Sequence, residues 1–124
     1  MAPTALVVDD DPFVQEVLAR WLAETGRTAM ACRTFEEAKA WLAEHNPDLL
    51  VTDIRLQGHN GLQLVLLLMN RKPDASCVVV TGHDDPVLRR EAEHLHARYL
   101  VKPFGRRAFL AVIQGGTQLP ATGT

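Results

Sequence analysis

Cysteine, long apolar segments and excess charge are all scarce in this sequence, and each absence excludes a class of protein. The two cysteines, Cys32 and Cys77, lie far apart and match no metal-binding or redox spacing. No apolar run is long enough to cross a bilayer, and residues 1–4 lack the basic and apolar regions of a signal peptide. The formal net charge of −2 gives no bulk electrostatic reason to expect nucleic-acid binding. The sequence thus predicts a cytoplasmic protein with reduced thiols and no direct contact with membrane or nucleic acid.

What is present is typical of one globular domain. The chain has 124 residues, of which 47 % are hydrophobic and 23 % are charged. Apolar segments predict strands at 5–8, 28–33, 49–52, 77–81 and 99–101. Helical periodicity separates them, and the last helix is expected over 104–114. Strands that alternate with helices predict a parallel sheet with right-handed crossovers, hence a three-layer, doubly wound α/β domain. The spacing alone leaves the strand order open.

Local signals place the starts of the helices. Asp11 followed by Pro12 is typical of an N-cap and a first helical residue. Thr34 opens a capping box with Glu37. Asp85 and the proline after it predict the start of a fourth helix.

Polar side chains stand where four of the predicted strands end. Asp9 and Asp10 follow the first strand, Asp53 follows the third, and Thr81 and Lys102 close the fourth and fifth. In a parallel α/β sheet, ligands bind outside the carboxyl ends of the strands. These five residues are therefore expected to meet in one site.

The chemistry of that site follows from its charges. Two carboxylates about 4 Å apart repel by roughly 4 kcal/mol at an effective dielectric of 20, so Asp9, Asp10 and Asp53 need a cation or a proton between them. Oxygen ligands suit Mg²⁺, which shares its coordination with phosphate oxygens. A carboxylate can act as a nucleophile and form an aspartyl phosphate. Lys102 can offer a compact positive charge to phosphoryl oxygens, and Thr81 a hydroxyl. The constellation predicts phosphoryl transfer.

Four short motifs together resemble the receiver domain of two-component response regulators. They are VVDDDP at 7–12, TDIR at 52–55 with Gly61 eight residues beyond Asp53, VTG at 80–82 and YLVKPF at 99–104. The resemblance runs from about residue 4 to 114. It implies a flavodoxin-like (βα)5 fold with strand order 2-1-3-4-5. Residues 1–114 would form the receiver domain, and 115–124 would be a tail or linker.

The resemblance also implies roles for the site residues. Asp53 would be the phosphoacceptor, supplied by a sensor histidine kinase or a phosphotransfer protein. Thr81 and Lys102 would bind the phosphoryl group, and Tyr99 would be an aromatic switch. Mg²⁺ would be held by a set of oxygen ligands: the carboxylates of Asp9, Asp10 and Asp53 and the backbone carbonyl of Arg55.

Further implications concern geometry, regulation and partners. The peptide bond between Lys102 and Pro103 would be cis. Arg55 and His83 occupy positions that tune dephosphorylation in the family, although both are equally compatible with solvated loop residues. An output domain or partner, or a second copy on phosphorylation, would contact the face made by the fourth helix, fifth strand and fifth helix, although its basic residues are equally compatible with a solvated face. The protein would be a signalling phosphoacceptor, not a general enzyme.

Some positions depart from the commonest family pattern. Leu56 and Gln57 stand where Met-Pro is frequent, and Gln57 is expected to loosen the loop because it restores a backbone N–H. The spacing from Thr81 to Lys102 is one residue shorter than expected. Residues 94–98 replace the usual Ala-Gly before the last strand, which leaves the fourth helix and its loop uncertain.

Two other function classes fit parts of the pattern. A phosphohydrolase with an aspartyl nucleophile usually has a second aspartate two residues later, where this chain has Arg55. A phosphate-independent, receiver-like interaction module commonly loses the acidic residues or the lysine, all of which are present here. A phosphorylation-activated receiver domain is therefore the prediction. The cognate kinase, the stimulus and the output are not encoded in this segment.

Overall fold

A five-stranded parallel sheet forms the centre of the computed structural model, which describes residues 4–114. The strand order is β2-β1-β3-β6-β7, with every neighbouring pair parallel. Counting only strands of this sheet, the order is the predicted 2-1-3-4-5, so the predicted fold is confirmed. The strands are β1 (Ala5–Val8), β2 (Ala29–Cys32), β3 (Leu49–Asp53), β6 (Ser76–Thr81) and β7 (Arg98–Val101).

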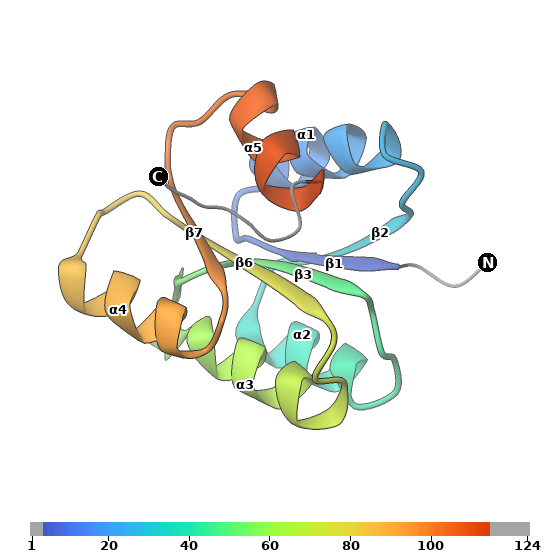
Figure 1. Ribbon diagram of the computed structural model, residues 1–124. Helices are drawn as coiled ribbons and strands as arrows, with labels where there is room; N and C mark the ends of the chain where they lie inside the picture. The colour runs from blue at the N-terminus through green and yellow to red at the C-terminus, as the bar shows by residue number, and fades with distance from the viewer. Residues whose placement is uncertain (1–3, 115–124) are drawn as a thin grey trace.

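Helices cover both faces of the sheet (Figure 1). On one face lie α1 (Pro12–Ala23) and α5 (Arg106–Gln114); on the other lie α2 (Phe35–Leu42), α3 (Leu62–Arg71) and α4 (Pro86–His94). Successive strand residues point to opposite faces, so β1 sends Val7 toward Leu18 and Phe109 in one core, and Leu6 toward Leu64 in the other. Burial on both faces explains why the central strands are continuously apolar.

The predicted helix starts are confirmed at three places. The Asp11 carboxylate accepts a hydrogen bond from the backbone N–H of Phe13 at 2.9 Å. Thr34 accepts one from Glu37 at 3.1 Å, and Asp85 caps α4 in the same way as Asp11 caps α1. The last helix begins at 106 and not at 104 as expected, because Gly105 supplies the first helical carbonyl and Phe104 turns aside to stack on Phe109.

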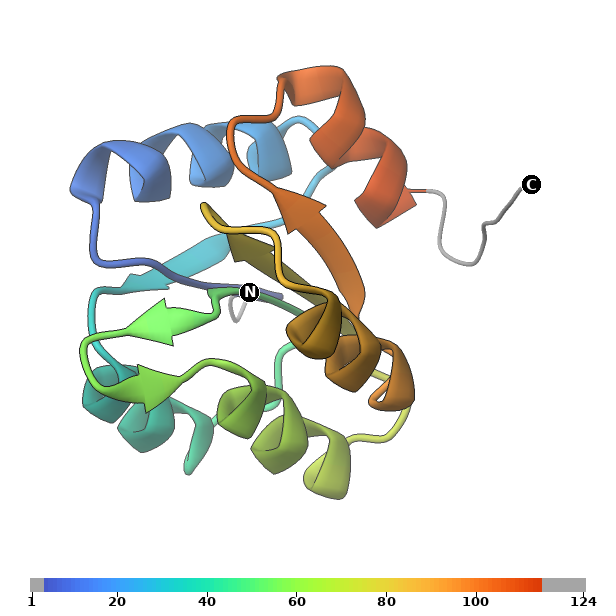
Figure 2. The ribbon, with the colours of Figure 1, turned by 90° about the vertical axis from the view of Figure 1, so that its left-hand side faces the viewer.

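A short antiparallel hairpin, expected as loop, follows the third strand of the sheet. It consists of β4 (Arg55–Leu56) and β5 (His59–Asn60), drawn as two short green arrows in Figure 2. Gln57 and Gly58 form its turn with φ of 44° and 88°, the double positive φ of two-residue hairpin turns. Proline cannot adopt this φ. Gln57 therefore permits a hairpin, so the expectation of a loop over 58–61 was wrong. The looser backbone expected from Gln57 stays a prediction.

The region after α4 is also ordered, although the sequence left it uncertain. His96 has a φ of 60°. Its N–H bonds the carbonyl of Glu93 at 2.9 Å, and the N–H of Ala97 bonds that of Ala92 at 2.9 Å. These two bonds form a Schellman motif, in which the residue with positive φ is usually glycine. Here a histidine takes that position, so α4 ends normally at the expense of local strain.

Within residues 4–114, none of the helices has both the length and the apolar character that a bilayer crossing requires. The predicted tail, 115–124, lies outside the described residues.

Candidate functional site

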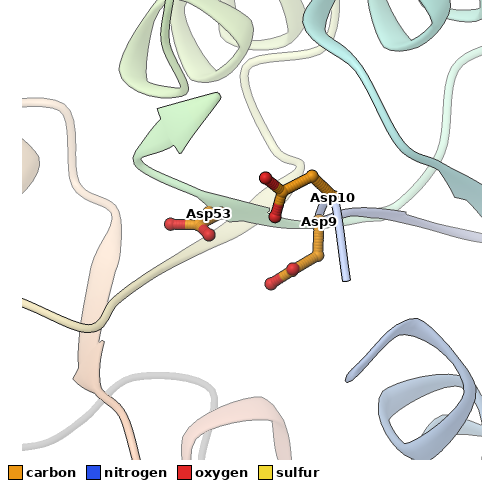
Figure 3. A group of neighbouring side chains, drawn as sticks. All are labelled: Asp9, Asp10 and Asp53. Carbon is orange, nitrogen blue, oxygen red and sulfur yellow. The ribbon is translucent and has the colours of Figure 1, made fainter. Parts of the chain in front are cut away.

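Three carboxylates converge at the carboxyl edge of the sheet, as the sequence predicts. Asp9 follows β1 and Asp53 ends β3, and these strands are hydrogen-bonded neighbours in register at Val8 and Thr52. Asp10 completes the group, and one oxygen from each carboxylate lies within 4.8 Å of the others. Figure 3 shows the three side chains side by side where their strands end. Oxygen donors at this density suit a hard divalent cation, so the cluster is a candidate metal site.

The three carboxylates differ in their exposure. Asp9 is buried, with 1 % of its surface exposed, Asp53 is 9 % exposed, and Asp10 faces solvent. The Asp9 carboxylate also accepts a hydrogen bond from the backbone N–H of Asp11 at 2.9 Å. Asp9 is thus fixed by the fold, whereas Asp10 is accessible to a ligand.

Lys102 lies across from the two buried carboxylates. Its Nζ is 2.9 Å from Asp9 Oδ2 and 3.3 Å from Asp53 Oδ2. Burial works against the ammonium, but hydrogen bonds and charge from Asp9 and Asp53 together raise the pKa of Lys102. The lysine is therefore cationic at neutral pH and offsets part of the acidic charge.

The negative charge of Asp53 is only partly offset by Lys102. Burial raises its pKa, the charge of Lys102 works in the opposite direction, and the charge of Asp9 raises the pKa further. The backbone N–H of Arg55 donates to Asp53 Oδ1 at 3.3 Å, a weak contact. A partly buried carboxylate that is incompletely paired favours the approach of a cation or an electrophile.

Gly61 allows the loop after the hairpin to pack closely against the end of β3. Its N–H donates to the carbonyl of Ile54 at 2.7 Å. A Cβ at this position would lie 2.1 Å from the backbone oxygen of Asp53 and 2.9 Å from Thr52 Oγ1. The sequence motif included Gly61 by spacing alone, and the structure supplies the reason: only glycine allows this approach.

Gln15 is a supporting residue that the sequence analysis missed. Its amide nitrogen donates to the backbone carbonyls of Asp9 and Cys32, each at 2.7 Å. It thereby fixes the end of β1, directly before Asp10, to the end of β2. A glutamine on an amphipathic helix carries no local signal for this role, since its partners come from strands.

Thr81 and Tyr99 lie on the opposite side of the site from Asp9. The Thr81 hydroxyl is fully buried and exchanges hydrogen bonds with the backbone N–H and carbonyl of His83, each at 3.1 Å. The Tyr99 hydroxyl accepts a hydrogen bond from the backbone N–H of Asp85 at 3.1 Å. Both polar groups are occupied by the loop between β6 and α4.

The remaining predicted residues are placed as follows. The Lys102–Pro103 bond is cis, as the resemblance implies. The side chains of Arg55 and His83 are exposed, which leaves their rate-tuning role a prediction. An apolar groove of about 490 Å³ borders Lys102 on the α1 side, and its lining includes Phe13, Trp21 and Phe104.

Comparison with known proteins gives the family that the sequence motifs resemble. The family model of the response regulator receiver domain matches residues 5–114. The transcriptional regulatory protein AruR of Pseudomonas aeruginosa is 34 % identical over an alignment of 117 residues, and the match covers 90 % of this chain and 48 % of AruR. The chain thus spans about half the length of this curated relative.

Solved structures agree. The crystal structure of a response regulator protein from Burkholderia pseudomallei with a phosphorylated aspartic acid, calcium ion and citrate is 27 % identical, with a TM-score of 0.81 over 93 % of this chain and 69 % of that one. The beryllofluoride-activated NtrC4 receiver domain dimer, solved in solution, is 27 % identical, with a TM-score of 0.82 over 90 % of this chain and 93 % of that one. The match over residues 5–114, together with the acidic cluster and Lys102, means that the chain belongs to the response regulator receiver domain family, the signalling domains of two-component systems.

Proposed function

We propose that Asp53 accepts a phosphoryl group from a histidine kinase or a phosphotransfer protein, and that the phosphorylated domain then switches an output surface. The observation that carries the proposal is the position of the Lys102 ammonium, 2.9 Å from Asp9 and 3.3 Å from Asp53 at the mouth of an acidic cluster. The phosphorylated aspartic acid of the Burkholderia relative supports the same chemistry.

The reaction would proceed by displacement at phosphorus. An oxygen of the Asp53 carboxylate forms the new O–P bond while the P–N bond of the donor phosphohistidine breaks, and the imidazole leaves with the electron pair. Lys102 is already directed at Asp53 and would shift its hydrogen bond to a phosphoryl oxygen. Thr81 would exchange its bond with His83 for another phosphoryl oxygen.

We assign Mg²⁺ to this site, because few protein ligands are offered and all are oxygens, which suits an ion that keeps several waters and shares phosphate oxygens. The carboxylates of Asp9, Asp10 and Asp53 and the backbone carbonyl of Arg55 would hold it. When bound, the ion supplies the positive charge that lets an anionic carboxylate approach an anionic phosphoryl group. The chain's own contribution is to keep Asp9 buried and paired, and Asp10 accessible.

The output would follow from the changed position of Thr81. Its movement would alter the loop that also holds Tyr99, and with it the face made by α4, β7 and α5. We place an output domain or partner on that face, together with a homodimer contact that phosphorylation strengthens. The domain would act in the cytoplasm as a signalling phosphoacceptor that catalyses only its own phosphorylation and dephosphorylation.

A small phosphodonor tests the chemistry without a kinase. Wild-type protein incubated with acetyl phosphate and Mg²⁺ should gain a phosphate that is stable to acid and labile to base. Asp53→Asn should gain none, and EDTA should abolish the reaction in the wild type. Labelling of Asp53→Asn equal to that of the wild type would overturn the proposal.

The groove beside Lys102 extends the proposal to the donor. Phe13 is 70 % exposed at its rim, and the groove beside it is lined by apolar side chains that include Trp21 and Phe104. The donor protein would rest here while its phosphohistidine reaches Asp53. Phe13→Asp should slow transfer from a protein donor and leave transfer from acetyl phosphate unchanged; equal slowing of both would place the defect in the chemistry and not in docking.

A further inference from the structure

Arg89 contacts two parts of the molecule that no sequence motif connects. It lies on α4, and its guanidinium carbon is 4.4 Å from the centre of the Tyr99 ring on β7. Its Nη2 is 3.3 Å from both carboxylate oxygens of Asp84, which lies in the loop after Thr81. One side chain therefore contacts the loop by charge and the ring by its face.

The Tyr99 hydroxyl is held by the same loop. It accepts a hydrogen bond from the N–H of Asp85 at 3.1 Å and lies 3.5 Å from the carbonyl of the same residue. Thr81, at the start of the loop, is bonded to the backbone of His83. The ring face, the ring hydroxyl and the Thr81 hydroxyl are thus all held by residues 83–89.

We propose that Arg89 is a positioning residue that clamps the Tyr99 ring against α4 and stabilises the arrangement in which the Thr81 hydroxyl bonds the backbone of His83. The effect on phosphorylation rests on the proposed function; the clamp itself does not. A ligand that binds only the phosphorylated arrangement must shift the protein out of the clamped arrangement. Loss of the clamp should therefore increase the apparent affinity for that ligand.

The clamp is weak because its ion pair is exposed to solvent. The Arg89 and Asp84 side chains are 44 % and 54 % exposed, and an exposed ion pair contributes little. A cation over an exposed aromatic ring adds a modest amount. Their combined loss should change a switching equilibrium by about two- to fivefold, which suits a group that must release during signalling.

The chain offers a matched control and a clean reporter. Arg90 is the next residue on α4, is also exposed, and its side chain takes part in no ion pair or ring contact among residues 4–114. Tyr99 is the only tyrosine in the sequence, so the ring resonances of isotope-labelled tyrosine report on it alone.

The first measurement uses the unphosphorylated protein. Arg89→Ala should move the ring resonances of Tyr99, Arg89→Lys should restore part of the wild-type position, and Arg90→Ala should leave them unchanged. Identical spectra for Arg89→Ala and Arg90→Ala would overturn the clamp.

The second measurement titrates beryllofluoride, a phosphoryl mimic, in the presence of Mg²⁺ and follows backbone amide resonances, which remain in a variant without Tyr99. Arg89→Ala should lower the half-saturating concentration about two- to fivefold, with no change in Arg90→Ala. The same substitution in a Tyr99→Ala background should have no effect.

A higher half-saturating concentration, or an effect that persists without the ring, would overturn the proposal. If the wild type does not bind beryllofluoride, the proposed function is contradicted. If Arg89→Ala still moves the Tyr99 resonances in that case, the ring contact remains supported.

Discussion

The two sides of the candidate site are built in different ways. On the acidic side, Asp9, Asp53 and Lys102 are brought together from three strand ends, with the lysine 2.9 Å and 3.3 Å from the two carboxylates. On the switch side, Thr81 and Tyr99 bond the backbone of one neighbouring loop, and Arg89 covers the ring from an exposed position. The acidic side depends on the whole sheet, whereas the switch side depends on a few local contacts.

This difference indicates a division of labour. Buried like charges are held in place before any ligand arrives, which reduces the reorganisation needed for chemistry at the expense of stability. The contacts of Thr81 and Tyr99 are hydrogen bonds that can be exchanged at little net free energy. The acidic side is therefore suited to the proposed phosphoryl transfer, and the side of Thr81 and Tyr99 to the proposed movement. The predictions below test this contrast, from the largest expected effect to the smallest.

Removing the cation should damage the acidic side most. Lys102→Met is expected to slow phosphorylation by acetyl phosphate about 100-fold, the typical loss of one charge-stabilising donor. The rate of phosphate incorporation at saturating Mg²⁺ measures it. Lys39→Met, on the exposed surface of α2, is the control and should behave as wild type. A loss smaller than threefold would mean that Lys102 has no part in the reaction.

Adding one methyl group beside Asp53 should strain the same side through the backbone. Gly61→Ala places a Cβ 2.1 Å from the Asp53 carbonyl oxygen, so the hairpin or the end of β3 must move. We expect the free energy of unfolding to fall by about 3 kcal/mol, measured by urea denaturation. Gly105→Ala is the control, because a Cβ there meets nothing within 4 Å. Equal stability of the two variants would contradict the close approach.

Neutralising Asp53 should stabilise the protein, although it abolishes phosphorylation. In metal-free buffer, Asp53→Asn is expected to raise the free energy of unfolding by on the order of 1 kcal/mol, because it relieves repulsion from Asp9 while Lys102 keeps its shorter contact. The side chain is partly reachable by solvent, which limits the gain. Asp10→Asn, on the exposed carboxylate, should change stability less. A less stable Asp53→Asn would show that Asp53 is well paired in the folded state.

The same variant gives a pH dependence with a defined sign. Burial raises the pKa of Asp53 above the value of the unfolded chain, which is roughly 3.9, so the folded state binds more protons between the two values. The stability of wild type relative to Asp53→Asn should fall as pH rises through that window and stay level above it. The pKa of Lys102 is also raised, so its contribution is lost only above roughly pH 10.4. A wild type that gains stability relative to the variant as pH rises would contradict this assignment.

Relieving the strained end of α4 should have the smallest effect and should spare the acidic side. His96 has a φ of 60°, and His96→Gly is expected to raise the free energy of unfolding by about 0.5–1 kcal/mol. His94→Gly, within the helix, should lower it by about 1 kcal/mol. Thermal unfolding measures both changes, and the phosphorylation rate should follow wild type in each. Destabilisation by His96→Gly would mean that its side chain contributes more than its backbone costs.

Much of the site could be predicted because its residues occupy strand ends. Each of Asp9, Asp53, Thr81 and Lys102 directly follows or closes an apolar run, and a parallel sheet brings such ends to one edge. Helix starts at Asp11 and Thr34 were equally readable, since a cap bonds a backbone group only two or three residues away. The hairpin after β3 was not predicted, because Gln57 is an uncommon residue for a turn with positive φ.

Sequence by itself determined the type of fold, the candidate acidic residues and the positions of the helix caps, because these depend on periodicity and on neighbours within one turn. Tertiary structure decided which partners those residues have: Gln15 between two strand ends, Gly61 against the Asp53 carbonyl, and Arg89 over Tyr99. Each of these contacts joins residues that lie on different elements of the fold. Local pattern carries no record of such an approach, because its physical cause is the packing of distant elements.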